Sequence, residues 1–133
     1  MEMTSCVQIE SEMDIVSARK IGRDLAKKMG FGEVDQARIA ATISELARNI
    51  YLYAGKGTIC IYQIAEDGRQ GLTIDAVDNG PGIDDIQRAM EDGFSTSGGL
   101  GAGLPGVKRL MDTISVHSER GKGTKISVTK WRS

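Results

Sequence analysis

The sequence predicts an α+β fold: a two-layer α/β sandwich whose mostly antiparallel, mixed sheet carries helices on one face. The prediction depends on the order of the segments, which is strand, two helices, two strands, a glycine-rich helical segment and two strands. Strands joined by short polar hairpin loops are antiparallel neighbours. Strands and helices therefore do not alternate as a doubly wound sheet requires. The 133 residues, 40% of them hydrophobic, are predicted to form a single domain over residues 1–133.

The first 53 residues contain one predicted strand and two predicted helices. Residues 6–9 are expected to form a short strand. Apolar residues then recur at helical spacing over residues 15–29, with Asp14 as the expected N-cap. A second helix is expected over about residues 35–53, where another apolar stripe continues at the same spacing.

The rest of the chain contains four predicted strands and two predicted helices. The strands are expected at residues 58–65, 72–77, 113–118 and 124–131, and the helices at residues 84–91 and from about Leu104. Pro105 sets the start of the last helix, because proline is tolerated only in a first turn. Gly82 follows Pro81 and fits the positive-φ position of a type II turn.

Composition and charge exclude several classes of protein. The 17 basic and 18 acidic residues give a net charge of -1, and the absence of a long basic run argues against a nucleic-acid partner. No apolar run approaches the roughly 18 residues of a membrane span, and the first residues lack the apolar core of a signal peptide. Cys6 and Cys60 are expected to be reduced thiols of a cytoplasmic protein.

A carboxylate and an amide lie one turn apart in the second predicted helix. Glu45 and Asn49 are four residues apart and therefore share one face of that helix. Each precedes a residue of the apolar stripe, so both lie at its edge. Both side chains would then point into a cleft beside the core. A solvated helix flank is the alternative interpretation.

Asp78 ends a predicted strand and opens the glycine-rich turn 78–82. Aspartate, asparagine and glycine are common turn residues, so turn formation alone explains the pattern. The functional interpretation is a fixed hydrogen-bond acceptor at a strand end, where glycines let a ligand approach the backbone.

Glycines gather beside the start of the last predicted helix. Ten of the 17 glycines lie between Gly80 and Gly123, and the run 98–103 leads directly into this helix. Backbone N–H groups and the positive end of the helix dipole would form an anion site there, whereas a plain surface loop is the alternative. Residues 101–106 also fit G-x-G-x-x-G, but no buried strand precedes them, which excludes a dinucleotide fingerprint.

Taken in order, these segments resemble the ATP site of the GHKL superfamily, which includes gyrase, Hsp90, histidine kinases and MutL. Residues 45–49 (Glu-Leu-Ala-Arg-Asn) are similar to its N box, and residues 78–82 (Asp-Asn-Gly-Pro-Gly) to its first glycine box. Residues 99–104 resemble its second glycine box, and residues 121–124 (Gly-Lys-Gly-Thr) its terminal G-x-G-T. The resemblance spans about residues 35–131 and implies the Bergerat fold, with ATP and Mg²⁺ as cofactors.

The resemblance implies a role for each matching residue. Asp78 would accept a hydrogen bond from the adenine amino group, and Thr124 would support Asp78. Asn49 would bind Mg²⁺ through its amide oxygen, because one protein ligand suffices where water and phosphate supply the others. Glu45 would act as the catalytic general base on the acceptor hydroxyl. The residues expected to shape the rest of the nucleotide site are Gly80, Gly82, Gly99, Leu100, Gly101, Ala102, Gly103 and Leu104.

Within the superfamily, the chain length favours the stand-alone serine/threonine kinases that regulate bacterial sigma factors. Residues 43–55 and 91–111 resemble the switch kinases of the stressosome among them. That resemblance implies phosphorylation of serine or threonine on STAS-domain proteins of the RsbS/RsbR type, followed by activation of an RsbU-type phosphatase. One alternative is an anti-sigma factor kinase of the RsbW/SpoIIAB type, which binds a sigma factor directly. The other is a binding module in which ATP is structural or absent.

Overall fold

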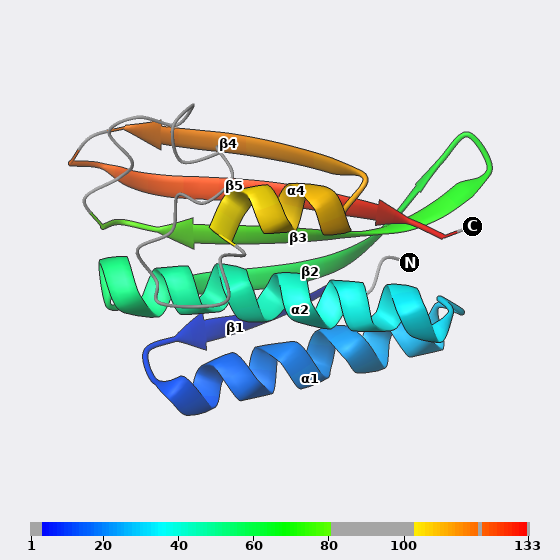
Figure 1. Ribbon diagram of the computed structural model, residues 1–133, viewed down its shortest axis with the longest axis horizontal. Coiled ribbons are helices and arrows are strands. Elements are labelled where there is room, and N and C mark those ends of the chain that lie inside the picture. Colours follow the sequence, from blue (N-terminus) through cyan, green and yellow to red (C-terminus); the bar gives the residue numbers. More distant parts are fainter. Residues whose placement is uncertain (1–3, 81–102, 120, 133) are drawn as a thin grey trace.

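The computed structural model describes residues 4–80, 103–119 and 121–132, in which the helices lie on one face of a single sheet (Figure 1). In chain order the elements are β1 (Thr4–Ile9), α1 (Glu12–Lys28), α2 (Glu33–Asn49), the π-helical turn η1 (Ile50–Ala54), β2 (Gly57–Glu66), β3 (Arg69–Asp78), α4 (Gly103–Leu110), β4 (Thr113–Glu119) and β5 (Gly123–Trp131). This arrangement confirms the predicted two-layer α+β fold. None of the described helices is long and apolar enough to cross a bilayer.

The sheet has the strand order β1-β2-β3-β5-β4, and every described pairing in it is antiparallel. The expectation of a mixed sheet is therefore wrong for the described strands. The reason lies in the connections: β2–β3 and β4–β5 are hairpins, and β4 runs in the same direction as β3. Because β5 lies between β3 and β4, these two parallel strands never pair.

The core lies between the sheet and the helices. Alternate residues of the central strands face the helices, and Ile61, Ile74 and Val128 are completely buried there. Helix α2 contributes the apolar stripe that was expected from its spacing, including the fully buried Ile39 and Ile43. The apolar residues spaced by 3.6 in the helix and by two in the strands thus pack against each other in one apolar layer.

Helix α1 begins earlier than expected. Ser11 is its N-cap, and Asp14 is the third helical residue of a capping box. The Oδ2 atom of Asp14 accepts hydrogen bonds from the backbone N–H of Glu10 at 2.9 Å and of Ser11 at 3.0 Å. Serine caps a helix as well as aspartate does, so local preference did not separate the two candidates.

Helix α2 ends at Asn49, and the chain continues as a π-helical turn rather than as an α-helix to residue 53. The N–H group of Gly55 donates to the carbonyl oxygen of Ile50 at 2.9 Å, and Gly55 ends the turn with a φ of 82°. The β2–β3 loop is also shorter than expected, since only Asp67 and Gly68 lie between the strands, both with positive φ. The predicted helix 84–91 and the predicted turn at Pro81 lie outside the described residues.

Cys6 and Cys60 form a disulfide, so the expectation of reduced thiols is wrong. The two residues are direct partners in the β1–β2 register, with 4.0 Å between their Cα atoms. This distance lies inside the limit of about 7 Å beyond which two cysteines cannot be bridged. The sequence separation of 54 residues gave no sign of it, because only the strand register brings the two thiols together.

Candidate functional site

Asp78 is held at the end of β3 on the face that the helices cover. In the sheet register it stands between Gly57 of β2 and Thr124 of β5. Its Oδ1 atom accepts a hydrogen bond from the backbone N–H of Gly80 at 2.9 Å, which fixes the orientation of the carboxylate. A carboxylate has about four acceptor sites, so Oδ2 retains the capacity to accept from a ligand.

Three glycines pack directly around Asp78. A Cβ atom added to Gly57 would lie 3.1 Å from the Cβ of Asp78, and one added to Gly80 would lie 2.7 Å from the Cβ of Ala54. A Cβ atom on Gly123 would overlap the carbonyl oxygen of Asp78. Any side chain at these three positions would therefore displace Asp78 or the elements around it.

The same contacts bring the end of α2 close to Asp78. A Cβ atom on Gly57 would also lie 2.8 Å from Cγ2 of Ile50, which immediately follows Asn49. The turn η1 packs against both β2 and β3. Figure 1 shows the end of α2 and the end of β3 at the same edge of the molecule, and the first turn of α4 is its end nearer to that edge. The N-box residues and Asp78, far apart in sequence, thus belong to one region.

Glu45 lies one turn before Asn49 and is a buried acid. Only 8% of its surface is exposed, and its Oε1 atom has no hydrogen-bond partner among the described residues. A buried polar atom without a partner is costly and needs an explanation. A solvated helix flank does not fit this burial. A carboxylate that accepts a proton, or a hydrogen bond from a ligand hydroxyl, fits it.

Asn49 is half-buried and makes no capping hydrogen bond to the turn that follows it. Its amide oxygen is the kind of hard ligand that Mg²⁺ prefers. Since Glu45 and Asn49 share one face of α2, the residues present fit a Mg²⁺–nucleotide complex at this end of the sheet.

Helix α4 carries the only part of the second glycine box that the structure describes. Gly103 is its first residue, and Leu104 is 5% exposed and anchors the first turn in the core. Pro105 lies in this first turn, as expected. The remaining predicted site residues, Gly82, Gly99, Leu100, Gly101 and Ala102, lie outside the described residues.

Thr124 lies beside Asp78, and its hydroxyl is 2.9 Å from Oγ of Ser118 on β4. Sequence analysis did not identify Ser118. Alternation within β4 places this serine on the helix-covered face, but only the register of the β4–β5 hairpin shows that it stands opposite Thr124. A hairpin register depends on the turn, which the sequence pattern does not fix to a single residue.

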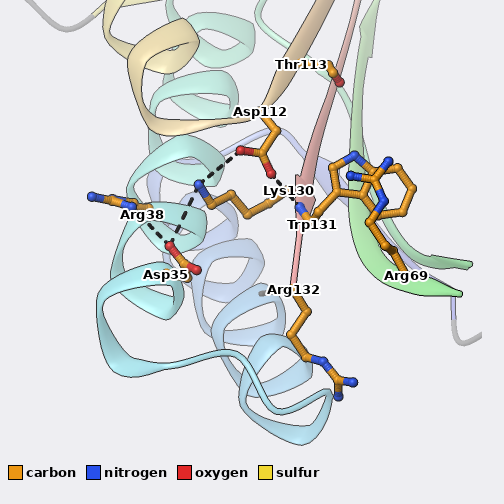
Figure 2. A pocket seen from close by; sticks show the side chains of 8 residues that line it. All are labelled: Asp35, Arg38, Arg69, Asp112, Thr113, Lys130, Trp131 and Arg132. Atoms are coloured by element: carbon orange, nitrogen blue, oxygen red, sulfur yellow. Dashed lines mark hydrogen bonds and ion pairs between the residues drawn. The ribbon is translucent and has the colours of Figure 1, made fainter. Parts of the chain in front are cut away.

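The opposite end of the sheet contains an open groove of about 770 Å³ that is built around an ion cluster (Figure 2). Nζ of Lys130 lies 3.8 Å from Oδ1 of Asp35 in α2 and 3.5 Å from Oδ1 of Asp112, which follows α4. Oδ2 of Asp112 also accepts from the backbone N–H of Trp131 at 2.7 Å. The cluster ties α2, the α4–β4 turn and β5 together, so we interpret it as structural.

Comparison with known proteins identifies the family of the chain. The family described as histidine kinase-, DNA gyrase B- and HSP90-like ATPases matches residues 34–132. The chain is 67% identical over 127 residues to the serine/threonine-protein kinase RsbT of Bacillus subtilis, covering 96% of both chains. It is 38% identical over 104 residues to an anti-sigma F factor of Clostridium acetobutylicum, covering 74% of this chain and 70% of the relative.

Two solved structures share the fold. The crystal structure of the RsbU and RsbW domains of Rv1364c from Mycobacterium tuberculosis superposes with a TM-score of 0.67 at 16% identity, over 100% of this chain and 33% of that one. The mycobacterial sensor histidine kinase MprB superposes with a TM-score of 0.57 at 15% identity, over 98% of both chains. The family match and the 67% identity to RsbT show that the chain belongs to the histidine kinase-, DNA gyrase B- and HSP90-like ATPase family and, within it, to the serine/threonine-protein kinases of the RsbT type.

Proposed function

We propose that this kinase transfers the γ-phosphate of Mg²⁺-bound ATP to serine or threonine hydroxyls of a protein partner. The observation that carries the proposal is the buried carboxylate of Glu45, whose Oε1 atom lacks a hydrogen-bond partner in the described part of the chain. A protein that only binds nucleotide has no need for such a group, which disfavours the binding-module alternative.

Each side chain has a distinct task in this proposal. Asp78 binds the adenine amino group and so orients the nucleotide. Asn49 holds Mg²⁺ through its amide oxygen, and the bound ion supplies charge neutralisation to the phosphates. Glu45 accepts the proton of the acceptor hydroxyl as that oxygen bonds to the γ-phosphorus and the bond to ADP breaks. Phosphoryl transfer depends mainly on positioning and charge neutralisation, so these few groups suffice.

We further propose STAS-domain proteins of the RsbS/RsbR type as the acceptors and an RsbU-type phosphatase as the second partner. The support is the 67% identity to RsbT over almost the whole chain. The anti-sigma F relative supports the alternative, in which a sigma factor is bound directly, but at lower identity and over less of the chain. Activity in the cytoplasm, where these partners would be met, belongs to the same proposal.

Radiolabelled phosphate transfer tests the proposal. The full chain is incubated with γ-labelled ATP, Mg²⁺ and either a STAS-domain protein or a sigma factor, and complexes are collected by affinity capture. We expect labelled serine or threonine on the STAS protein and no stable sigma-factor complex. Capture of the sigma factor without transfer to the STAS protein would instead favour the anti-sigma alternative.

A further inference from the structure

Three polar side chains form a row across the end of the sheet at the candidate nucleotide site. Asp78 of β3 is the register partner of Thr124 of β5, and Thr124 is the register partner of Ser118 of β4. Directly paired residues point to the same face, which here is the face that the helices cover. All three side chains are half-buried, so each meets the site from the sheet side.

Ser118 makes hydrogen bonds to Gly123 and to Thr124 in this row. Oγ of Ser118 donates to the carbonyl oxygen of Gly123 at 3.1 Å, and the same oxygen lies 2.9 Å from Oγ1 of Thr124. A serine hydroxyl has one proton and two lone pairs. Either hydroxyl can donate in the contact between them, but the carbonyl oxygen of Gly123 can only accept. The arrangement that satisfies both contacts is therefore the one in which Ser118 donates to Gly123 and Thr124 donates to Ser118. The lone pairs of Thr124 then remain beside Asp78.

We propose that Ser118 is a positioning residue that makes the site specific for a 6-aminopurine over a 6-oxopurine. By accepting a hydrogen bond from Thr124, Ser118 leaves the hydroxyl oxygen of Thr124 as a second acceptor next to the Asp78 carboxylate. A 6-amino group offers two N–H donors to such a pair, whereas a 6-oxo group would place its own acceptor against them. A site whose acceptors are left unpaired by the wrong ligand rejects that ligand.

The inference rests on the proposed adenine contact of Asp78. Its test therefore distinguishes a failure of the Ser118 role from a failure of the adenine contact. The dissociation constants of ATP and of inosine triphosphate are measured by calorimetry on the full chain, together with the midpoint of thermal unfolding. We expect Ser118→Ala to lower the preference for ATP over inosine triphosphate by about threefold to tenfold, the equivalent of one hydrogen bond. Ser118→Thr, which keeps the hydroxyl, should restore the preference.

Two further variants sharpen the test. Thr124→Val removes the acceptor itself, and adding Ser118→Ala to it should cause no additional loss, since both act through one bond. Ser115→Ala is the matched control: Ser115 lies on the same strand, but on the outer face, where its hydroxyl bonds to His117. This control should leave the preference unchanged.

Several results would overturn the inference. If Ser118→Ala weakens both nucleotides equally or only lowers the unfolding midpoint, Ser118 is merely structural. If Asp78→Asn abolishes the preference while Ser118→Ala and Thr124→Val leave it intact, the adenine contact stands and the role of Ser118 is wrong. If the parent chain binds no ATP, the adenine contact of Asp78 and the role of Ser118 are both wrong. Should Ser118→Ala not fold, an unchanged preference in Thr124→Val alone is sufficient to refute the proposal.

Discussion

Gly123 lies with its backbone directly against the backbone of Asp78. A Cβ atom on Gly123 would overlap the carbonyl oxygen of Asp78 and would stand 2.8 Å from the Cα of Asn79. Gly123 also has a φ of 109°, a conformation that residues with a side chain rarely adopt. The end of the β4–β5 hairpin and the end of β3 can therefore meet only because this residue has no side chain.

Replacing Gly123 should damage the site more than replacing its neighbour in the same turn. Gly123→Ala is expected to lower the free energy of unfolding by roughly 1–3 kcal/mol from backbone strain alone, and to weaken ATP binding as Asp78 moves. Gly121→Ala is the control, since Gly121 also has a positive φ but has nothing within 4 Å of an added Cβ. Chemical denaturation and calorimetry measure both effects. Equal ATP affinity in the two variants would contradict the packing argument.

Asp78→Asn should weaken nucleotide binding without unfolding the protein. The asparagine keeps an oxygen for the N–H of Gly80, but its NH₂ group replaces the acceptor that faces the ligand. Loss of a hydrogen bond to a charged group costs about 1.5–3 kcal/mol, so ATP affinity should fall at least about tenfold. Calorimetry measures this, with the unfolding midpoint as the control for folding. An ATP affinity equal to that of the parent would refute the adenine role.

Glu45→Gln should separate binding from transfer. The glutamine fills the same buried space but cannot accept the proton, so ATP affinity should be retained while the transfer rate falls by about 10²–10⁴-fold. Single-turnover transfer of labelled phosphate to a STAS-domain acceptor measures the rate. A variant that transfers as fast as the parent would exclude Glu45 as the base.

Reduction of the Cys6–Cys60 disulfide should destabilise the protein. The bond closes a loop across a sequence separation of 54 residues, and removing such a cross-link typically costs roughly 2–4 kcal/mol. Denaturation with and without a thiol reductant should show the difference, and alkylation followed by mass spectrometry should find the thiols blocked before reduction. The free energy of unfolding of Cys6→Ser should equal that of the reduced parent and should not change when the reductant is added. Two free thiols in the untreated protein would contradict the disulfide.

Acid should weaken the start of α1 through Asp14. The backbone N–H of Glu10 donates to this carboxylate and lowers the pKa of Asp14 below its ordinary value of 3.8. Desolvation opposes this shift, and the hydrogen bonds from Ser11 add to it. A carboxyl whose pKa is lower in the folded state stabilises the fold above the unfolded pKa and loses that contribution as pH falls through the folded pKa. Asp14→Asn should lack this part of the acid dependence in pH-resolved denaturation. An identical acid dependence in the variant would show that the capping box contributes nothing.

The sequence by itself determined the fold class, the order of the elements and the positions of Glu45, Asn49 and Asp78. These features are local: helical spacing, strand alternation and turn chemistry each act within a few residues. Boundaries were less secure where two local preferences compete. Ser11 and Asp14 both cap helices well, and the change from α- to π-helix after Asn49 leaves no clear mark in the apolar pattern.

The tertiary structure alone decided which distant residues meet. Strand register opposes Cys6 with Cys60 and Ser118 with Thr124, and it sets Gly123 against Asp78. The Lys130 cluster likewise joins three elements that no local pattern connects. Local preferences fix what each segment becomes, but a one-residue change of register would exchange every neighbour while leaving those preferences unchanged.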